Sequence, residues 1–375
     1  MKHVFSGLVL GLTLLVPGAL WAQEVHQELQ ETVPAKVLEV VNQEERDIMG
    51  TGATTTVQNL RIEILGGAKA GEVVPLLNDL VVLDEGDRIF VNRLVAIDGV
   101  EYYAFKDVER RWQLLILGVM LVVMITLFAG WQGIRALLSL GFSIVAILYL
   151  LIPALLDGYN PALASFVLAA IILGVTLFVT HGPKLHVAIA YAGTMLAVAV
   201  TCLIAWFSVD WLRLTGFSAD ASVYLNFATG GSLDLAGVLL GSIIIGLLGV
   251  LDDVAITQAS VVQELKFANP TFRWRELYER SIRVGRDHVG SLVNTLALAY
   301  VGAALPLVLL FARSEASFID SINLEVIAAE FLRIMVGSMG LVLAVPFTSL
   351  LAAYYFQSRT VDKVTEHSCG HHHHH

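Results

Sequence analysis

The sequence predicts an α-helical polytopic membrane bundle of about seven transmembrane helices, with a small N-terminal extracytoplasmic all-β domain of OB-like type. Hydrophobic residues make up 56% of the chain and charged residues only 15%. That is too little charge for a soluble protein of 375 residues. The bias is also local, because residues before Arg111 resemble an ordinary soluble sequence and those after Trp112 form a series of apolar runs.

Residues 1–22 have the pattern of a secretory signal peptide. A short basic start precedes an apolar stretch from Val4 to Trp21, and cleavage is expected after Ala22. Leu20 is larger than the residue usual at its place before a cleavage site, so the segment could instead stay as an anchor. In both cases it sends the next domain, residues 23–110, across the bacterial cytoplasmic (inner) membrane.

Five short strands are predicted between residues 34 and 108, because apolar and polar residues alternate there and glycines mark the turns. Five strands in so short a domain suit a small barrel of OB type. The domain is acidic and has no basic face with interleaved aromatic residues, so we expect no nucleic-acid partner and favour a spacer or gating module. The predicted strands are Lys36–Val41, Thr56–Ile64, Glu72–Leu77, Arg88–Val91 and Tyr102–Phe105.

Residues 111–358 are predicted to form the transmembrane domain, because a crossing helix needs about 20 apolar residues. An extracytoplasmic start and seven crossings would place the C-terminus in the cytoplasm. The cytoplasmic segments would then hold about ten Lys and Arg residues and the outer loops about three, which agrees with the positive-inside rule. Residues 359–375 are a tail ending in a His run typical of an expression tag. The seven apolar runs are Leu114–Gly130, Ala136–Leu156, Pro161–Thr180, Val187–Val209, Leu233–Ser260, Val289–Phe311 and Leu332–Phe356.

Two adjacent acids are the most informative residues, because charges inside a membrane are costly and usually functional. Asp252 and Asp253 lie well inside the fifth apolar run. Thr257 follows Asp253 by four positions and Ser260 by seven, so these three residues share a helix face. The face offers oxygen ligands for an ion or a hydrogen-bonded relay for protons.

A second polar cluster opens the sixth run with Arg286, Asp287 and His288. Asp287, Ser291 and Asn294 have the spacing of one helix face.

If the fifth and sixth spans are neighbours, Arg286 and His288 can pair with the first two acids. Asp252, Asp253 and Asp287 could then hold a hard metal cation, the one cofactor that the sequence suggests, or carry protons. The structural alternative is that Asp252 and Asp253 cap a broken helix or form an ion pair with Arg286.

A third polar cluster contains His181, Lys184 and Thr194, around the turn between the third and fourth runs. Gly182-Pro183 forces a turn there. A basic turn on the cytoplasmic side is ordinary membrane topology, so we favour that interpretation over a functional one.

The chain is similar to the YibE/F family of bacterial multi-pass membrane proteins from about Ala35 to Tyr355. The resemblance rests on Gly86-Asp87-Arg88, the turn at His181–Lys184 with Gly193-Thr194, and two long motifs. These motifs are GVLDDVAITQA (249–259) and VGRDHVGSLVNTLALAY (284–300). The resemblance implies a membrane fold and does not imply a reaction.

We expect an inner-membrane transporter or channel that moves a small ion, either a divalent cation or a proton-coupled solute, by means of its intramembrane carboxylates. Its expected partners are the lipid bilayer, the ion and further copies in a homo-oligomer. The alternative is a scaffold or regulator whose β domain binds a periplasmic partner. An intramembrane enzyme is disfavoured, because the segment from Gly249 to Asp252 lacks the second glycine of the aspartyl protease motif.

Overall fold

The computed structural model of the protein describes residues 29–47, 54–95, 100–313 and 317–358. The predicted signal peptide or anchor (1–22) and the tail with the His run (359–375) lie outside the described residues. Internal contacts divide the chain into two compact units, Met1–Met120 and Leu121–His375.

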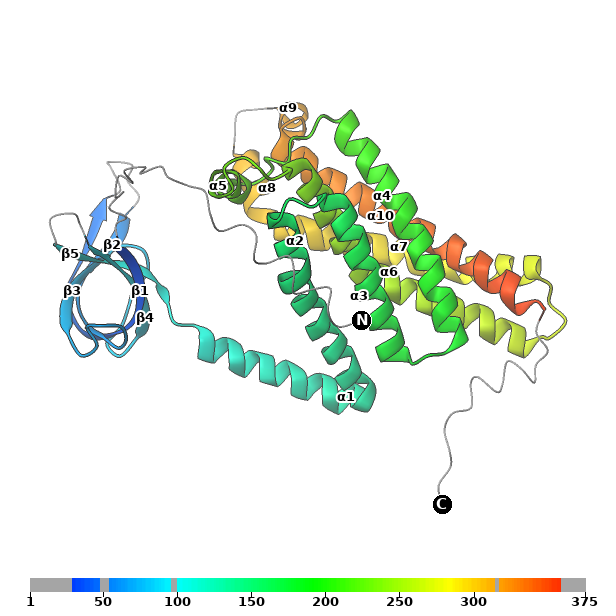
Figure 1. Ribbon diagram of the computed structural model, residues 1–375, viewed down its shortest axis with the longest axis horizontal. Coiled ribbons are helices and arrows are strands. Elements are labelled where there is room, and N and C mark those ends of the chain that lie inside the picture. Colours follow the sequence, from blue (N-terminus) through cyan, green and yellow to red (C-terminus); the bar gives the residue numbers. More distant parts are fainter. Residues whose placement is uncertain (1–28, 48–53, 96–99, 314–316, 359–375) are drawn as a thin grey trace, which may run out of the picture. The chain divides into compact units, whose positions relative to one another are not determined.

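The first unit is built on an antiparallel sheet with the strand order β3-β2-β1-β4-β5. Its central strand pairs on both sides, because residues 29–36 pair with β4 and residues 35–47 pair with β2. Two irregularities of register after Val37 and Val40 bend this strand, and the sheet curls into a half-barrel (Figure 1). The strands are β1 (Leu29–Asp47), β2 (Thr54–Ile64), β3 (Val73–Asn78), β4 (Arg88–Val95) and β5 (Glu101–Val108).

The half-barrel has its own apolar core, and the five predicted strands are confirmed. Along β3, exposed and buried residues alternate, with Val74 and Leu76 inside. The first strand begins at Leu29, earlier than the predicted Lys36, because its N-terminal half pairs with β4. The core residues are Val33, Ala35, Val37, Leu60, Ile62, Ile64, Val74, Leu76, Leu83, Ile89 and Val91.

The remaining elements are helices (Figure 1). They are α1 (Arg111–Ala146), η1 (Ile147–Leu151), α2 (Ile152–Leu156), α3 (Pro161–His181), α4 (Leu185–Trp211), α5 (Asp220–Ala228), α6 (Leu235–Ala268), α7 (Trp274–Ala303), α8 (Leu305–Ala312), α9 (Phe318–Ile322) and α10 (Glu325–Phe356).

By length and composition, five helical segments of the described chain could cross a membrane, and a bent pair brings the number to 6. The bent pair is α7 and α8, which meet at 68° where Pro306 opens α8. The first two predicted spans lie in one 46-residue segment, Arg111–Leu156, which consists of two helices joined across a kink. The backbone of Gly130 is non-helical inside this segment, with φ 57° and ψ −136°.

The helix α6 is the centre of the bundle and contacts α3, α4, α7 and α10. Small residues allow close approach. A Cβ added to Gly241 would lie 2.4 Å from the Ser165 hydroxyl of α3, and one added to Gly193 of α4 would lie 2.4 Å from the Thr348 hydroxyl of α10. Gly237 likewise faces Pro161, so Gly237 and Gly241 allow α6 to pack closely against α3.

Candidate functional site

Asp252 and Asp253 line a cavity of about 460 Å³ between α6, α3 and the C-terminal half of α1. Asp252 is partly buried and Asp253 is exposed. The backbone N–H of Asp253 donates a hydrogen bond of 2.9 Å to Oδ1 of Asp252. Both acids therefore belong to the α6 wall of the cavity, and Asp252 is the more buried of the two.

Hydroxyl groups and a histidine form the polar part of the opposite walls. The buried hydroxyl of Ser139 lies 3.4 Å from that of Thr180, which joins α1 to α3. On each of the two helices, two hydroxyl residues lie four positions apart in an otherwise apolar stretch, which places them on one helix face. This spacing is the sequence signal that could have predicted them. The sequence analysis missed these hydroxyl residues, which are Ser139, Ser143, Thr176 and Thr180.

A groove of about 630 Å³ follows along the same face of α6. Thr257, Ser260 and Glu264 line it, and their spacing continues the face that begins at Asp253. His181 lines both the groove and the cavity. The structure therefore places His181 at the junction of two polar spaces.

Contacts with α3 give the depth of the acids. Because Gly237 and Gly241 face Pro161 and Ser165, the two helices run in the same direction and Asp252 is level with Thr176. The 21 residues of α3 span about 31 Å, one hydrocarbon thickness. Asp252 thus lies about 7 Å inside the end of α3 at 1.5 Å per residue.

The second predicted cluster points away from this cavity. Arg286, Asp287, His288, Ser291 and Asn294 are all exposed, and none of them lines the cavity.

The residue that faces inward on this part of α7 is Gly285, whose added Cβ would lie 2.6 Å from Val345. Asp287 comes two residues later, about 200° around the helix, so it points to the opposite side. Within the described chain no ion pair joins Arg286 or His288 to the first two acids. The pairing expected from the sequence is therefore not formed.

The predicted metal site of Asp252, Asp253 and Asp287 is not formed either. The described residues contain no group of three or more His, Cys, Asp or Glu side chains that could hold a metal ion. The reason is again the rotation of α7, which separates Asp287 from the two acids of α6.

The third predicted cluster is divided. His181 faces the acids, Lys184 is exposed in the turn before α4, and Thr194 is buried in the bundle. The Thr194 hydroxyl donates a hydrogen bond of 2.8 Å to the carbonyl of Ala190. Only His181 therefore belongs to the cavity.

A family model described as "YibE/F-like protein" matches residues 117–358. The chain belongs to the YibE/F-like family. Searches of curated proteins and of solved structures found no match. The family match, together with the apolar helices, fits a multi-pass membrane protein, and it contains every residue that lines the cavity and the groove.

This YibE/F-like protein carries a second charged group at membrane depth, which the sequence analysis did not predict. Arg333 of α10 forms an ion pair with Glu330, and its guanidinium lies 3.4 Å from the Ser242 hydroxyl of α6. Both charged side chains are mostly buried. The sequence did contain a signal for this ion pair, because an acid and a base lie three positions apart within an apolar run. Because the two charges compensate each other, we assign this pair a structural role.

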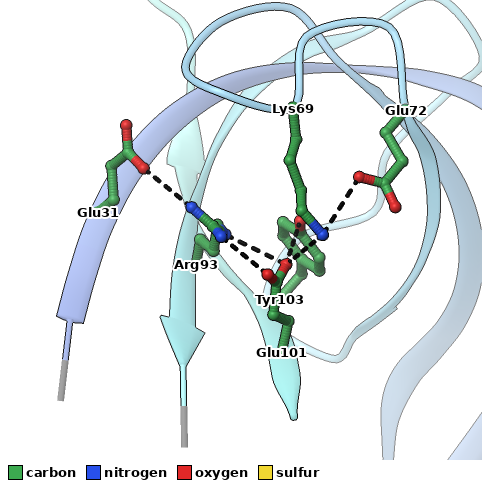
Figure 2. Close-up of polar contacts among 6 residues, drawn as sticks. All are labelled: Glu31, Lys69, Glu72, Arg93, Glu101 and Tyr103. Carbon is green, nitrogen blue, oxygen red and sulfur yellow. Dashed lines mark hydrogen bonds and ion pairs between the residues drawn. The ribbon is translucent and has the colours of Figure 1, made fainter. Parts of the chain in front are cut away.

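The half-barrel holds a separate network of charges centred on Glu101 (Figure 2). Arg93 lies 2.8 Å and Lys69 2.7 Å from its carboxylate. Hydrogen bonds from Arg93, and then from Lys69, lower the pKa of Glu101 to about 2. Lys69 belongs to the turn before β3, so the network connects this turn to β4 and β5. Glu31 and Glu72 complete it by pairing with Arg93 and Lys69.

Proposed function

We propose that this YibE/F-like protein conducts or transports a small cation across the membrane, and that the proton is the species that its site suits best. The observation that carries the proposal is the position of Asp252 and Asp253, which face a cavity lined with hydroxyls and His181 at membrane depth. Intramembrane acids that face a polar cavity are typical of ion and proton pathways.

A proton suits the donor set better than a divalent cation. Calcium takes six to eight oxygen ligands and magnesium demands near-ideal octahedral geometry. The cavity offers two carboxylates from adjacent positions of one helix, with serine and threonine hydroxyls opposite. Two acids, hydroxyls and an imidazole are sufficient for a proton relay.

The pathway that we propose runs from Glu264 along the groove, past His181, to Asp253 and Asp252. The groove and the cavity share His181, so a proton held on its ring could pass from one to the other. Lys184 lies in the adjoining turn, and the positive-inside rule assigns this end of the bundle to the cytoplasm. The pathway therefore opens to the cytoplasm and ends inside the membrane in this conformation.

Seven crossings remain our proposed topology for the inner membrane. The 46-residue segment Arg111–Leu156 would be about 69 Å long, which exceeds two hydrocarbon thicknesses. Gly130 interrupts it with a positive φ that glycine adopts readily. A reversal at Gly130 makes two spans, which puts the β domain in the periplasm and the C-terminus in the cytoplasm.

We also infer that the half-barrel is of OB type. Its strand order is that of a five-stranded barrel in which β3 and β5 meet to close the sheet, and these two strands contact each other. A small β domain of this kind before the first span suits a spacer or gating module, the role that we propose for it.

A flux assay in proteoliposomes tests the function. A potassium diffusion potential should drive proton uptake by the wild type, read with an internal pH dye. The double variant Asp252→Asn/Asp253→Asn should lower the rate at least about tenfold, which corresponds to a barrier about 1.4 kcal/mol higher.

Asp210→Asn is the matched control, because Asp210 is an exposed acid of α4 that lines neither polar space. Gel filtration should show that all variants are folded. Equal rates in the double variant and the wild type would overturn the proposal, as would a wild type that passes neither protons nor sodium, potassium or magnesium.

A second candidate function is a scaffold or regulator that binds a periplasmic partner. Apolar side chains at the edge of the sheet favour it, because Leu77, Leu80 and Val82 are each more than half exposed. A partner that co-purifies with the wild type, and is lost in Leu80→Lys/Val82→Lys while flux is unchanged, would support this role.

We propose no enzymatic activity. Intramembrane aspartyl proteases use two aspartates from two helices, whereas both acids of this cavity come from adjacent positions on α6.

A further inference from the structure

A polar stripe runs along the side of α7 that faces away from the bundle. Arg283, Asp287, Ser291 and Asn294 are exposed, and their spacing of four, four and three residues places them on one helix face. Gly290 lies beside them, and a Cβ added to it would have no neighbour within 4 Å. We call these five residues the α7 stripe.

Part of the α7 stripe lies at the depth of the hydrocarbon. On α6, Gln258 faces Gly285 of α7, and Gly246 faces the Tyr300 hydroxyl. The two helices are therefore antiparallel, and Asp252 is level with residues 291–294 of α7. Ser291 and Asn294 thus lie about 7 Å inside the membrane, where lipid offers no hydrogen bond.

The exposed Asn294 amide has no side-chain hydrogen bond to any residue that the structure describes. The neighbouring Thr295 hydroxyl, by contrast, donates a hydrogen bond of 3.0 Å to the carbonyl of Ser291. An amide without a partner in hydrocarbon is costly, so this face requires a partner that supplies polar groups.

We propose that the partner is a second copy of this chain, which binds through its own α7 stripe. Both copies enter the membrane in the same orientation, so a two-fold axis along the membrane normal brings the stripe against itself. An amide both donates and accepts hydrogen bonds, and Asn294 can therefore pair with Asn294 of the second copy.

The rest of the stripe is complementary to itself in the same arrangement. Arg283 and Asp287 have opposite charges and lie one helical turn apart, so each arginine can reach the aspartate of the other copy. Gly290 and Ser291 are small and allow the two helices to approach closely, as is typical of associating membrane helices. The interface is independent of the cavity, because none of the five residues lines it.

Cysteine cross-linking in native membranes tests this contact. In a background with Cys202→Ser and Cys369→Ser, Asn294→Cys should give a disulfide-linked dimer on oxidation. Ile171→Cys is the matched control, because Ile171 is 44% exposed on α3. It lies within about 7 Å of the same depth, since Thr176, five residues later on α3, is level with Asp252. Equal dimer yields at the two positions, with both thiols open to a maleimide, would overturn the proposal.

The strength of association gives a second, independent readout. The dissociation constant in liposomes, measured by energy transfer between labelled copies, should rise about three- to twentyfold in Asn294→Leu, the range for polar contacts between membrane helices. Asn294→Gln should recover most of the affinity, because its amide keeps both hydrogen-bonding functions. An unchanged dissociation constant in Asn294→Leu, or a monomeric wild type, would refute a second copy as the partner. If a monomeric protein still shows cation flux, the dimer proposal fails while the proposed function stands.

Discussion

Gly285 of α7 lies against Gln258 of α6, where a Cβ added to the glycine would be 3.0 Å from Oε1 of the glutamine. The Gln258 amide is buried and donates a hydrogen bond of 2.7 Å to the carbonyl of Ser281, one turn earlier on α7. This contact fixes which side of α7 faces the bundle. It explains why Asp287 and Asn294 point away from Asp252.

Gly285→Ala should destabilise the bundle by about 1–3 kcal/mol, the usual cost of inserting a methyl group into a packed core. The new Cβ would meet Val345 at 2.6 Å. The measurement is the free energy of unfolding in a mixed detergent titration. Gly302→Ala on the same helix is the control and should be neutral or stabilising, because nothing lies within 4 Å of its Cβ position. A Gly285→Ala protein as stable as the control would show that the two helices are not in close contact.

Lys266→Met should cost on the order of 3 kcal/mol, because hydrogen bonds to charged groups are strong and buried groups left unpaired are expensive. The buried Lys266 ammonium donates to the carbonyls of Pro270, Phe272 and Gln357 at 2.8, 3.1 and 3.2 Å. It therefore connects the end of α6 to the end of α10. The exposed Lys184, changed to Met, is the control. Equal melting temperatures for the two variants would contradict the structural role of Lys266.

His181→Ala should slow proton flux by about tenfold or more, because the imidazole lines both the groove and the cavity. Added imidazole should restore part of the rate. The control is His186→Ala, since His186 is also partly buried near the same turn and lines neither space. The measurement is the initial rate of the dye signal in proteoliposomes, and similar losses in both variants would remove His181 from the pathway.

Acid should weaken the half-barrel through Glu101. Its pKa falls from 4.5 to about 2 on folding, so its ion pairs stabilise the fold above pH 4.5. This stabilisation is lost as the pH falls towards 2. In residues 23–110 expressed alone, wild type should resist urea better than Glu101→Gln at pH 7, and the difference should vanish near pH 2. A difference that is constant across this range would mean that the carboxylate is not paired.

The sequence was sufficient for the strands, for the apolar helices and for membership of the family, because these depend on periodicity and long motifs. The faces of the helices were harder. The spacing of Asp287, Ser291 and Asn294 correctly indicated one face of α7, but spacing cannot tell whether a face turns inward. That is decided by tertiary packing at Gly285, whose neighbours Gln258 and Val345 lie on other helices.

The cavity walls were missed for a similar reason. Ser139 and Thr180 are separated by 41 positions, and each reads alone as a hydroxyl that binds its own helix, which is what Ser139 also does with the carbonyl of Ala136. Only the contact between α1 and α3 brings the two hydroxyls together as walls of one cavity. His181 was assigned to an ordinary turn, because its distance along the chain from Asp253 conceals their shared cavity.

The long strand β1 also sets an order of events during synthesis. Its C-terminal half meets β2 after a short connection, whereas its N-terminal half must wait for β4, as the hydrogen bond between Thr32 and Asn92 across 60 positions illustrates. Distant pairing is slow because a long loop must close first. The nascent chain can therefore form a β1–β2 hairpin early, but it cannot shield its apolar interior until about residue 95 has emerged.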